Sequence, residues 1–351
     1  QLTVKEDGIL SNAIIFPWAE ILYKNKKNKV SLLTNGTAQS QEDQLEKAIE
    51  NLEFSFSNAI YELQEEKEKK IAVLSGNGEL SDVQLYSFLS EVTKKHRLAK
   101  FTLDSVTTNP LKTLLDLQQF DLTIIAKPTQ PFTENEKLVL DQYIINGGKT
   151  LWMLENVQAD TDSLYNNGSM LAYPRDLNLT DFFFSYGLRV NATLLQDLYA
   201  AKIPLATGNI GNKPQFQNLN WFYHPLVSGN PNHAISKNIT PVRLRFANQI
   251  DTLQNNLKKT PLLMSSMLTK KVGTPAIIEL NSIANEPREE EFSSGFQITG
   301  LLTEGLFNSM YTDRVKPFSI HDFRKKSLYN KMVVISDGDI GRNQLQKGKP
   351  F

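Results

Sequence analysis

The sequence predicts an α/β protein in which a parallel sheet is flanked by helices, with additional α+β elements. Strand-like and helix-like patterns alternate from residue 70 to residue 155, and short connections join them. The strand-like segments "KIAVLSG" (70–76) and "FDLTIIAKP" (120–128) are apolar at nearly every central position. Such runs are typical of parallel strands that helices cover on both faces.

Local signals place the helices between these strands. Ser81 with Gln84, and Thr133 with Glu136, have the spacing of a capping box, in which two side chains satisfy free backbone N–H groups. The pair Gly147–Gly148 ends the second of these helices, because glycine adopts the left-handed conformation that a helix end needs. The remaining elements of this region are strands at 100–106 and 149–155 and a short helix at 110–117.

The residues before this core form an N-terminal region, 1–68, with a strand at Val30–Leu33 and a long helix at 40–66. Ser40 is the expected N-cap of the helix. Apolar residues recur at spacings of three and four along one stripe, at Leu45, Ile49, Leu52, Phe56, Ala59 and Leu63. The charged segment that follows this helix marks the boundary to the α/β core at 69–158.

Residues 159–351 are expected to continue the α/β domain. A helix is predicted at 179–190, and the Gly-, Asn-, Pro- and Gln-rich stretch at about 205–236 has the composition of a long loop or insertion. The final core strand is predicted at 331–336. The other expected strands are 191–197, 242–246, 260–266, 274–280 and 296–304, and a charged surface turn is expected at 285–292.

Composition excludes several classes of function. The chain has 351 residues, with 38 Lys and Arg against 38 Asp and Glu, so its net charge gives no support to nucleic-acid binding. It has no cysteine, which excludes disulfides, thiolate metal sites and cysteine nucleophiles. No apolar stretch reaches the roughly 20 residues of a membrane helix. The first residue is Gln1 rather than Met, and we expect the chain to be a soluble piece of a longer protein.

The segment "SDGD" directly after the last strand is the first candidate for chemistry. Asp337 and Asp339 flank a glycine at the carboxyl end of a strand, where α/β proteins often place ligands. Carboxylates there could hold a metal ion, or bind a phosphate through its counter-ion. Asp and Gly are also the residues that tight turns favour. No matching carboxylate motif accompanies them, so a turn is the simpler interpretation.

The other candidates have weaker patterns. Gly76-Asn77-Gly78 lies between a strand and a helix, but it lacks the third glycine of a dinucleotide site and the Gly-Lys-Ser/Thr of a P-loop. None of the four histidines has metal-ligand spacing with another, and no serine lies in a G-x-S-x-G elbow. Glu304 and Arg314 are expected to form structural or solvated ion pairs, or to face a partner.

Several long segments are distinctive, among them "DLTIIAKPTQPFTENEKLVLDQYIINGGKTLWMLENVQADTDSL" (121–164), "FFFSYGLRVNATLLQDL", "LLTEGLFNSMYTDR" and "KMVVISDGDIGRN". Together they resemble the GldG family, the auxiliary component of the gliding-motility ABC transport system of Bacteroidetes. The resemblance extends in order from about Ile14 to Asn343.

This resemblance implies a periplasmic domain of an inner-membrane protein, anchored by membrane segments outside this sequence. It also implies two partner subunits, a GldF-like permease and a GldA-like ATPase. The implied α/β fold is similar to flavodoxin or to class I glutamine amidotransferases. The likeness to the amidotransferases is one of fold only, because those enzymes need a cysteine nucleophile. The family supplies no catalytic residue, cofactor or metal ligand to carry over.

We therefore expect a non-enzymatic domain that docks onto protein partners through loops at the carboxyl edge of its sheet, with "SDGD" as part of a turn or interaction surface. The candidate interaction residues are Gly76, Asn77, Glu79, Pro128, Glu155, Glu304, Arg314, Asp337, Asp339 and Arg342. One alternative is a glycan- or peptide-binding cleft with an aromatic surface from Trp221, Phe222 and Tyr223. A further alternative is a metal-dependent hydrolase using Asp337, Asp339 and either Glu155 or Glu304.

Overall fold

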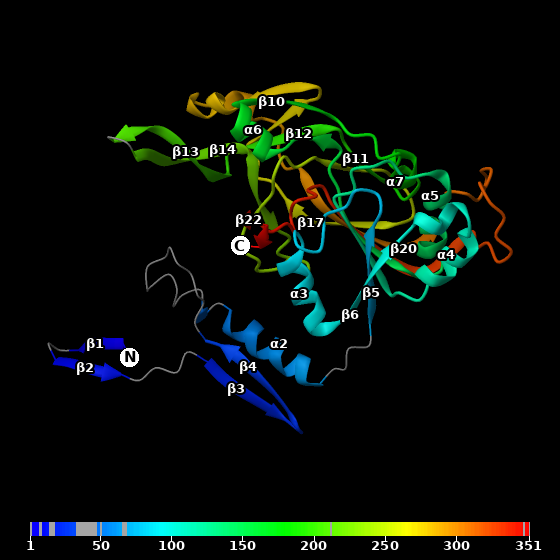
Figure 1. Ribbon diagram of the computed structural model, residues 1–351, viewed down its shortest axis with the longest axis horizontal. Coiled ribbons are helices and arrows are strands. Elements are labelled where there is room, and N and C mark those ends of the chain that lie inside the picture. Colours follow the sequence, from blue (N-terminus) through cyan, green and yellow to red (C-terminus); the bar gives the residue numbers. More distant parts are fainter. Residues whose placement is uncertain are drawn as a thin grey trace. The chain divides into compact units, whose positions relative to one another are not determined.

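A computed structural model describes residues 2–6, 9–13, 18–32, 48–49, 51–64, 69–210, 213–346 and 348–350. The chain divides into two compact units, Gln1–Glu68 and Lys69–Phe351 (Figure 1). No helix among the described residues combines the length and the apolar character needed to cross a membrane.

The first unit contains two hairpins and a helix. Strands β1 (Leu2–Glu6) and β2 (Ile9–Ala13) pair antiparallel, as do β3 (Trp18–Tyr23) and β4 (Lys26–Ser31). The helix α2 (Leu52–Gln64) is the described part of the predicted long helix, and it buries Ala59 and Leu63. Leu52 and Ile49, from the same predicted stripe, are exposed. Residues 33–47, with the expected cap Ser40 and Leu45, lie outside the described residues.

Five parallel strands form the centre of the second unit. They are β5 (Lys70–Ser75), β6 (Arg97–Thr102), β7 (Leu122–Ala126), β8 (Lys149–Met153) and β21 (Lys326–Ile335). Their spatial order is β6-β5-β7-β8-β21, with every neighbouring pair parallel. These five strands form a parallel centre within a larger mixed sheet. Numbered along the chain, this is the 2-1-3-4-5 order of flavodoxin-like sheets; the flavodoxin-like assignment itself stays a prediction.

Helices cover both faces of this sheet (Figure 1). Helices α4 (Pro110–Leu117) and α5 (Glu134–Ile145) pack on one face, in a core that includes Trp152. Helix α3 (Tyr86–Lys95) packs on the other face against Ile71, Ile124 and Met153. The capping box of α5 is present as predicted, and the Ser81–Gln84 pair forms its reciprocal hydrogen bonds in the turn before α3. A 3-10 turn, Asp104–Thr107, precedes α4.

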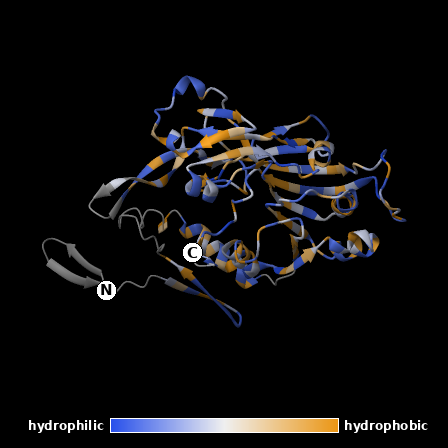
Figure 2. Cartoon of the chain, turned by 45° about the horizontal axis from the view of Figure 1, so that its top comes forward, coloured by the Kyte–Doolittle hydropathy of each residue, from blue (hydrophilic) through white to orange (hydrophobic). Residues whose placement is uncertain are grey.

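The sheet continues beyond β21 with antiparallel strands, to ten strands in total. In spatial order these are β20 (Ile298–Asn308), β17 (Lys258–Met264), β14 (Lys213–Gly229) and β13 (Ala200–Ile210), and β15 (Val242–Arg243) pairs with β14. Figure 2 shows hydrophobic residues concentrated along the strands of this unit, while many connecting loops are hydrophilic.

The predicted loop at 205–236 was wrong, because most of it forms the long hairpin of β13 and β14. The proline and polar content that indicated a loop is compatible with β13 because it lies at the edge of the sheet, where proline is tolerated. Trp221 and Tyr223 are buried on alternate positions of β14, which is the period-two pattern of a strand. The hairpin also shifts register between Ala200 and Lys202.

The predicted helix at 179–190 was too long. Helix α7 (Thr180–Ser185) ends before Gly187, whose φ of +79° is left-handed, and β11 (Leu188–Val190) follows. The expected strand at 242–246 is likewise reduced to the two residues of β15.

Small antiparallel pairs build a second core beside the main sheet, around Trp221, Leu194 and Ile278. They are β9 (Val157–Gln158) and β19 (Ala276–Glu279) on either side of β10 (Ser169–Pro174), and β12 (Thr193–Asp197) with β18 (Thr269–Gly273). A further antiparallel pair, β11 with β16 (Ile250–Thr252), packs in the main core. The helical segments of this region are α6 (Thr161–Asn167) and the 3-10 turns Leu280–Ala284 and Glu289–Glu291. Near the C-terminus, β22 (Leu345–Gln346) pairs with β23 (Lys349–Pro350).

Candidate functional site

Four loops meet at the carboxyl edge of the parallel strands. They follow β5, β7, β8 and β21, which are neighbours in that order, and they comprise residues 76–80, 127–131, 155–160 and 337–342. The first two are joined directly, because the backbone N–H groups of Thr129 and Gln130 both donate to the carbonyl of Asn77 at 2.9 Å. This is the switch point between β5 and β7, where sheets of this order place ligands.

Lys127 is the centre of this edge. Its ammonium Nζ lies 3.0 Å from Oε1 of Glu155 and 2.6 Å from Oδ2 of Asp339, so one cation joins the loops after β7, β8 and β21. Arg342 adds a second cation, with Nη1 at 3.2 Å from Oδ1 of Asp339. Asp337 completes what we call the Lys127 cluster, which consists of Lys127, Glu155, Asp337, Asp339 and Arg342.

The carboxylates of Glu155, Asp337 and Asp339 each offer an oxygen within 4.8 Å of the others. Hard divalent cations take oxygen ligands of this kind. The ammonium of Lys127, however, already lies against two of these carboxylates. A divalent ion would have to displace it, so the observed arrangement is that of a buried ion cluster.

Asp337 also has a turn-forming role. Its carboxylate accepts hydrogen bonds from the backbone N–H of Arg245 at 2.8 Å and from that of Asp339 at 2.7 Å. The second bond, to the residue two positions on, is the local bond that makes Asp favourable in turns. The "SDGD" segment is therefore a tight turn and also a part of the charged cluster, which combines two of the alternatives that the sequence left open.

Burial shifts the proton affinities of this cluster. Removal from water, aided by the nearby Asp339 and Asp337 and opposed by Lys127, raises the pKa of Glu155 to about 8. Burial and the Asp339 charge raise the pKa of Asp337 to about 7. The pKa of Asp339 is lowered despite its burial, because Lys127 and Arg342 favour its ionised form. The cluster thus has more carboxylates than cations and retains a proton near neutral pH.

The loop after β5 is a tight turn packed on its neighbour. Gly78 has a φ of +75°, and a Cβ added there would lie 2.0 Å from the hydroxyl oxygen of Thr129. The backbone N–H of Asn77 donates to the carboxylate of Glu79 at 2.8 Å, and its side-chain amide donates to Glu136 at 3.3 Å. The backbone N–H and the side-chain NH2 of Asn77 are therefore engaged in hydrogen bonds within the protein.

Several candidate interaction residues have buried side chains. Asn77, Pro128, Glu155 and Asp337 are buried, so they position their loops and do not face solvent. Gly76 is exposed, and Glu79, Asp339 and Arg342 are half-buried.

Glu304 and Arg314 lie apart from this edge. Glu304 pairs with Lys331 at 2.9 Å, in the middle of β21, whereas the Lys127 cluster lies beyond the end of that strand. Arg314 pairs with Asp181 at 2.8 Å. The hydrolase alternative required either Glu155 or Glu304 beside Asp337 and Asp339. The structure brings Glu155 there and does not bring Glu304.

The aromatic surface expected of Trp221, Phe222 and Tyr223 is not formed. Trp221 and Tyr223 pack in the second core, with their ring centroids 5.4 Å apart, and Phe222 packs edge-on against Phe292. Aromatic residues in this hairpin thus hold it to the domain.

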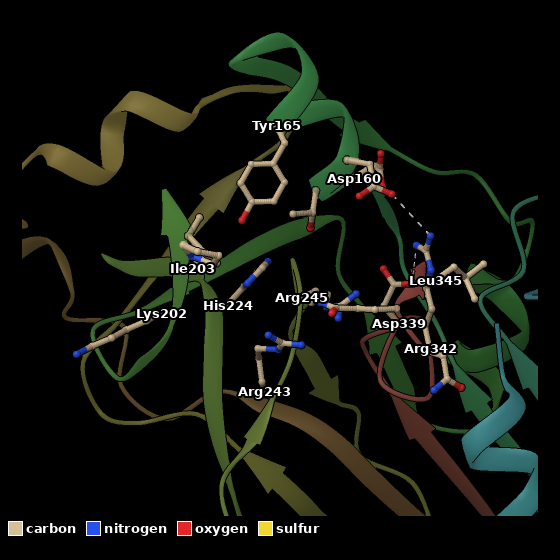
Figure 3. A pocket seen from close by; sticks show the side chains of 15 residues that line it. Asp160, Tyr165, Lys202, Ile203, His224, Arg243, Arg245, Asp339, Arg342 and Leu345 are labelled. Atoms are coloured by element: carbon tan, nitrogen blue, oxygen red, sulfur yellow. Dashed lines mark hydrogen bonds and ion pairs between the residues drawn. The ribbon is translucent and has the colours of Figure 1, made fainter. Parts of the chain in front are cut away.

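A cavity of about 640 Å³ lies beside the Lys127 cluster (Figure 3). It shares Asp339 and Arg342 with the cluster, and β13, β14 and α6 contribute the facing walls. Two of its basic side chains, Arg243 and Arg245, were missed by sequence reasoning. The signal was present in "VRLRF", since arginines two positions apart in an extended segment point to the same side.

Comparisons with known proteins identify the class of this domain. Residues 68–351 match the family described as an ABC-type uncharacterized transport system, which covers the second unit. The chain belongs to this family of ABC transport auxiliary components, and its partners are components of an ABC transporter. No curated relative matches the sequence.

One similar solved structure is described as "mmIFT52 N-terminal domain". It shares 15% identity, covers 78% of this chain and 88% of its own, and has a TM-score of 0.43. At that score the likeness supports no conclusion about fold or function.

Proposed function

We propose that this domain is a non-enzymatic, periplasmic docking component of an ABC transport complex linked to gliding motility. Membership of the transport auxiliary family over residues 68–351 is the observation that carries the proposal. The resemblance of "KMVVISDGDIGRN" and the other long segments to the GldG family supports the finer assignment. Its partners would be a GldF-like permease and a GldA-like ATPase, and membrane segments outside this sequence would anchor it.

The geometry of the carboxyl edge supports docking rather than catalysis. Lys127 is bonded to two carboxylates, and Asp337 accepts two backbone hydrogen bonds, so these groups are engaged in holding loops together. Loops fixed in this way lose little conformational entropy when a partner binds, which favours recognition. The buried members of the set act as supports, and exposed neighbours such as Gln130 and Pro131 would make the contacts.

The test is recovery of partners with the full-length, membrane-anchored protein from native membranes. Gln130→Arg places a bulky cation on the exposed edge, and Gln119→Arg is the matched control, since Gln119 is exposed before β7 at the amino edge. We expect wild type and Gln119→Arg to recover the permease and ATPase in fixed ratio, and Gln130→Arg to lose them. Equal recovery by both variants would show that this edge is not the docking surface.

A ligand-binding role is the second candidate, and the cavity beside the Lys127 cluster favours it. Its volume lies within the range of about 300–1,000 Å³ that small-molecule sites have. A glycan or peptide would have to bind without the aromatic surface expected from the sequence. The charges that line the cavity specify a narrower class of ligand.

A further inference from the structure

His224 on β14 is a buried imidazole that lacks hydrogen-bond partners. It is 3% exposed, and neither of its ring nitrogens has a hydrogen bond. It lines the cavity defined above, together with Arg243 and Arg245. Burial, with help from these two arginines, lowers the pKa of His224 to about 3, so the ring is neutral. A neutral imidazole has one donor and one acceptor, and leaving both unused in a buried site is costly.

Arg243 and Arg245 provide two further groups without partners. Among the described residues, neither guanidinium has a hydrogen bond or a carboxylate within ion-pair distance. They lie two positions apart, Arg243 at the end of β15 and Arg245 in the bend that follows it, and both line the same cavity. Burial and the charge of Arg245 lower the pKa of Arg243, which means that its positive charge is poorly compensated in the unliganded protein.

The acidic residues of the cavity have other partners, and among the described residues none forms an ion pair with these arginines. Asp160 caps helix α6 by accepting from the backbone N–H of Ser163 at 2.9 Å. Asp339 is paired with Lys127 and Arg342, and Asp162 lies 3.9 Å from Arg342. Figure 3 shows Asp339 and Arg342 on one side of the cavity, His224 and Arg243 on the other, and Arg245 between them.

The cavity therefore has one wall of satisfied ion pairs and one wall of unpaired donors. Guanidinium groups bind carboxylate and phosphate oxygens through two parallel hydrogen bonds, which makes an oxyanion the matching ligand. The neutral His224 and the phenol of Tyr165, which also lines the cavity, would suit hydroxyl groups on the same molecule.

We propose that this cavity binds a small hydroxylated organic anion, with its phosphate or carboxylate group held by Arg243 and Arg245 and a hydroxyl group at His224. The site goes beyond docking, because it needs only the second unit and no partner subunit. Loss of ligand binding and loss of complex assembly are thus separate outcomes of separate measurements.

The experiment is calorimetric titration of the 351-residue chain at constant ionic strength in a chloride buffer. The probes are inorganic phosphate, glycerol 3-phosphate, D-glucuronate and the neutral D-glucose. We expect at least one anion to bind and glucose not to bind. Comparison of the phosphate probes with glucuronate tells which oxyanion the arginines prefer.

Variants connect binding to the cavity. Arg243→Met removes a guanidinium that lines the cavity and has no ion pair, so the variant is expected to fold, and its Kd should rise about tenfold, the value of one charge-assisted contact. Arg288→Met is the matched control, since Arg288 is exposed and outside the cavity. His224→Phe keeps an aromatic ring but removes both nitrogens, and it should weaken the hydroxylated anions more than inorganic phosphate.

The proposal is overturned by any of three results. The first is that none of the anions binds. The second is that glucose binds as tightly as the anions. The third is that Arg243→Met and Arg288→Met bind the anion with the same Kd as wild type.

Discussion

The proton retained by the Lys127 cluster predicts an unusual pH dependence of stability. In the unfolded chain Glu155 has its ordinary pKa of 4.5, and in the folded protein burial raises it to about 8. Between these values the folded state holds a proton that the unfolded state has released. Stability from this group is therefore greatest below pH 4.5 and is lost as the pH rises through 8.

The substitution Glu155→Gln isolates this effect, because glutamine has a similar shape and does not titrate. One proton changes the free energy of unfolding by about 1.4 kcal/mol per pH unit. From pH 6 to pH 8 this gives at most about 3 kcal/mol, and the partial titration of Glu155 near pH 8 reduces it to about 2 kcal/mol. Between pH 6 and pH 8, we expect the free energy of unfolding of the variant to rise by about 2 kcal/mol relative to that of wild type.

The assay is urea denaturation followed by circular dichroism at pH 6, 7 and 8, with the stability difference between variant and wild type as the measured quantity. Using the difference cancels the titrating groups that do not interact with Glu155, including His224. Glu91→Gln is the matched control, because Glu91 is an exposed carboxylate on α3, outside the Lys127 cluster. Parallel pH profiles for wild type and Glu155→Gln would refute the retained proton.

Three further predictions use the same denaturation assay. Gly78→Ala should lower the free energy of unfolding by more than about 2 kcal/mol, and Gly168→Ala should lower it by about 1 kcal/mol. Both glycines have a left-handed φ, but only at Gly78 would the added Cβ lie 2.0 Å from a neighbouring atom. Equal losses would contradict the packing argument. Thr133→Ala should cost about 1 kcal/mol, because it removes the cap of α5, and no loss would show that the cap is dispensable. Because the pKa of His224 is lowered, this residue makes the protein less stable as the pH drops from about 6.5 towards 3. His224→Phe should remove about 1.4 kcal/mol of this loss of unfolding free energy per pH unit. The same dependence of stability on pH in the variant and in wild type would refute the neutral imidazole.

The parts of this fold that could be read from the sequence are those set by local interactions. The capping box at Thr133 and Glu136 needs residues only three positions apart, and its helix begins where the sequence predicts. The apolar runs of β5 and β7 likewise report burial on both faces without knowledge of their neighbours. Such signals are sufficient for the parallel core, because four of its five strands follow one another with short connections.

The long-range parts could not be read in this way. Strand β21 joins β8 after an excursion through the antiparallel strands and the second core, and no local pattern states which strand it will join. The hairpin of β13 and β14 was missed because its prolines and polar residues are acceptable at a sheet edge, which composition does not reveal. The role of Lys127 as counter-ion could not be read either, because it depends on Asp339, 212 positions away.

Asp339 connects the two surfaces proposed for this domain. One oxygen of its carboxylate faces Lys127, which supports the loops of the carboxyl edge, and the other faces Arg342 on the wall of the cavity. The backbone N–H of the same residue is held by Asp337, whose carboxylate also accepts from the backbone of Arg245 in the opposite wall. The turn of "SDGD" is thus bonded to both walls of the ligand cavity and to the loops proposed for docking. A partner that moves this turn would change the spacing of Arg245 and Arg342, so these two carboxylates provide a route by which docking could change ligand affinity.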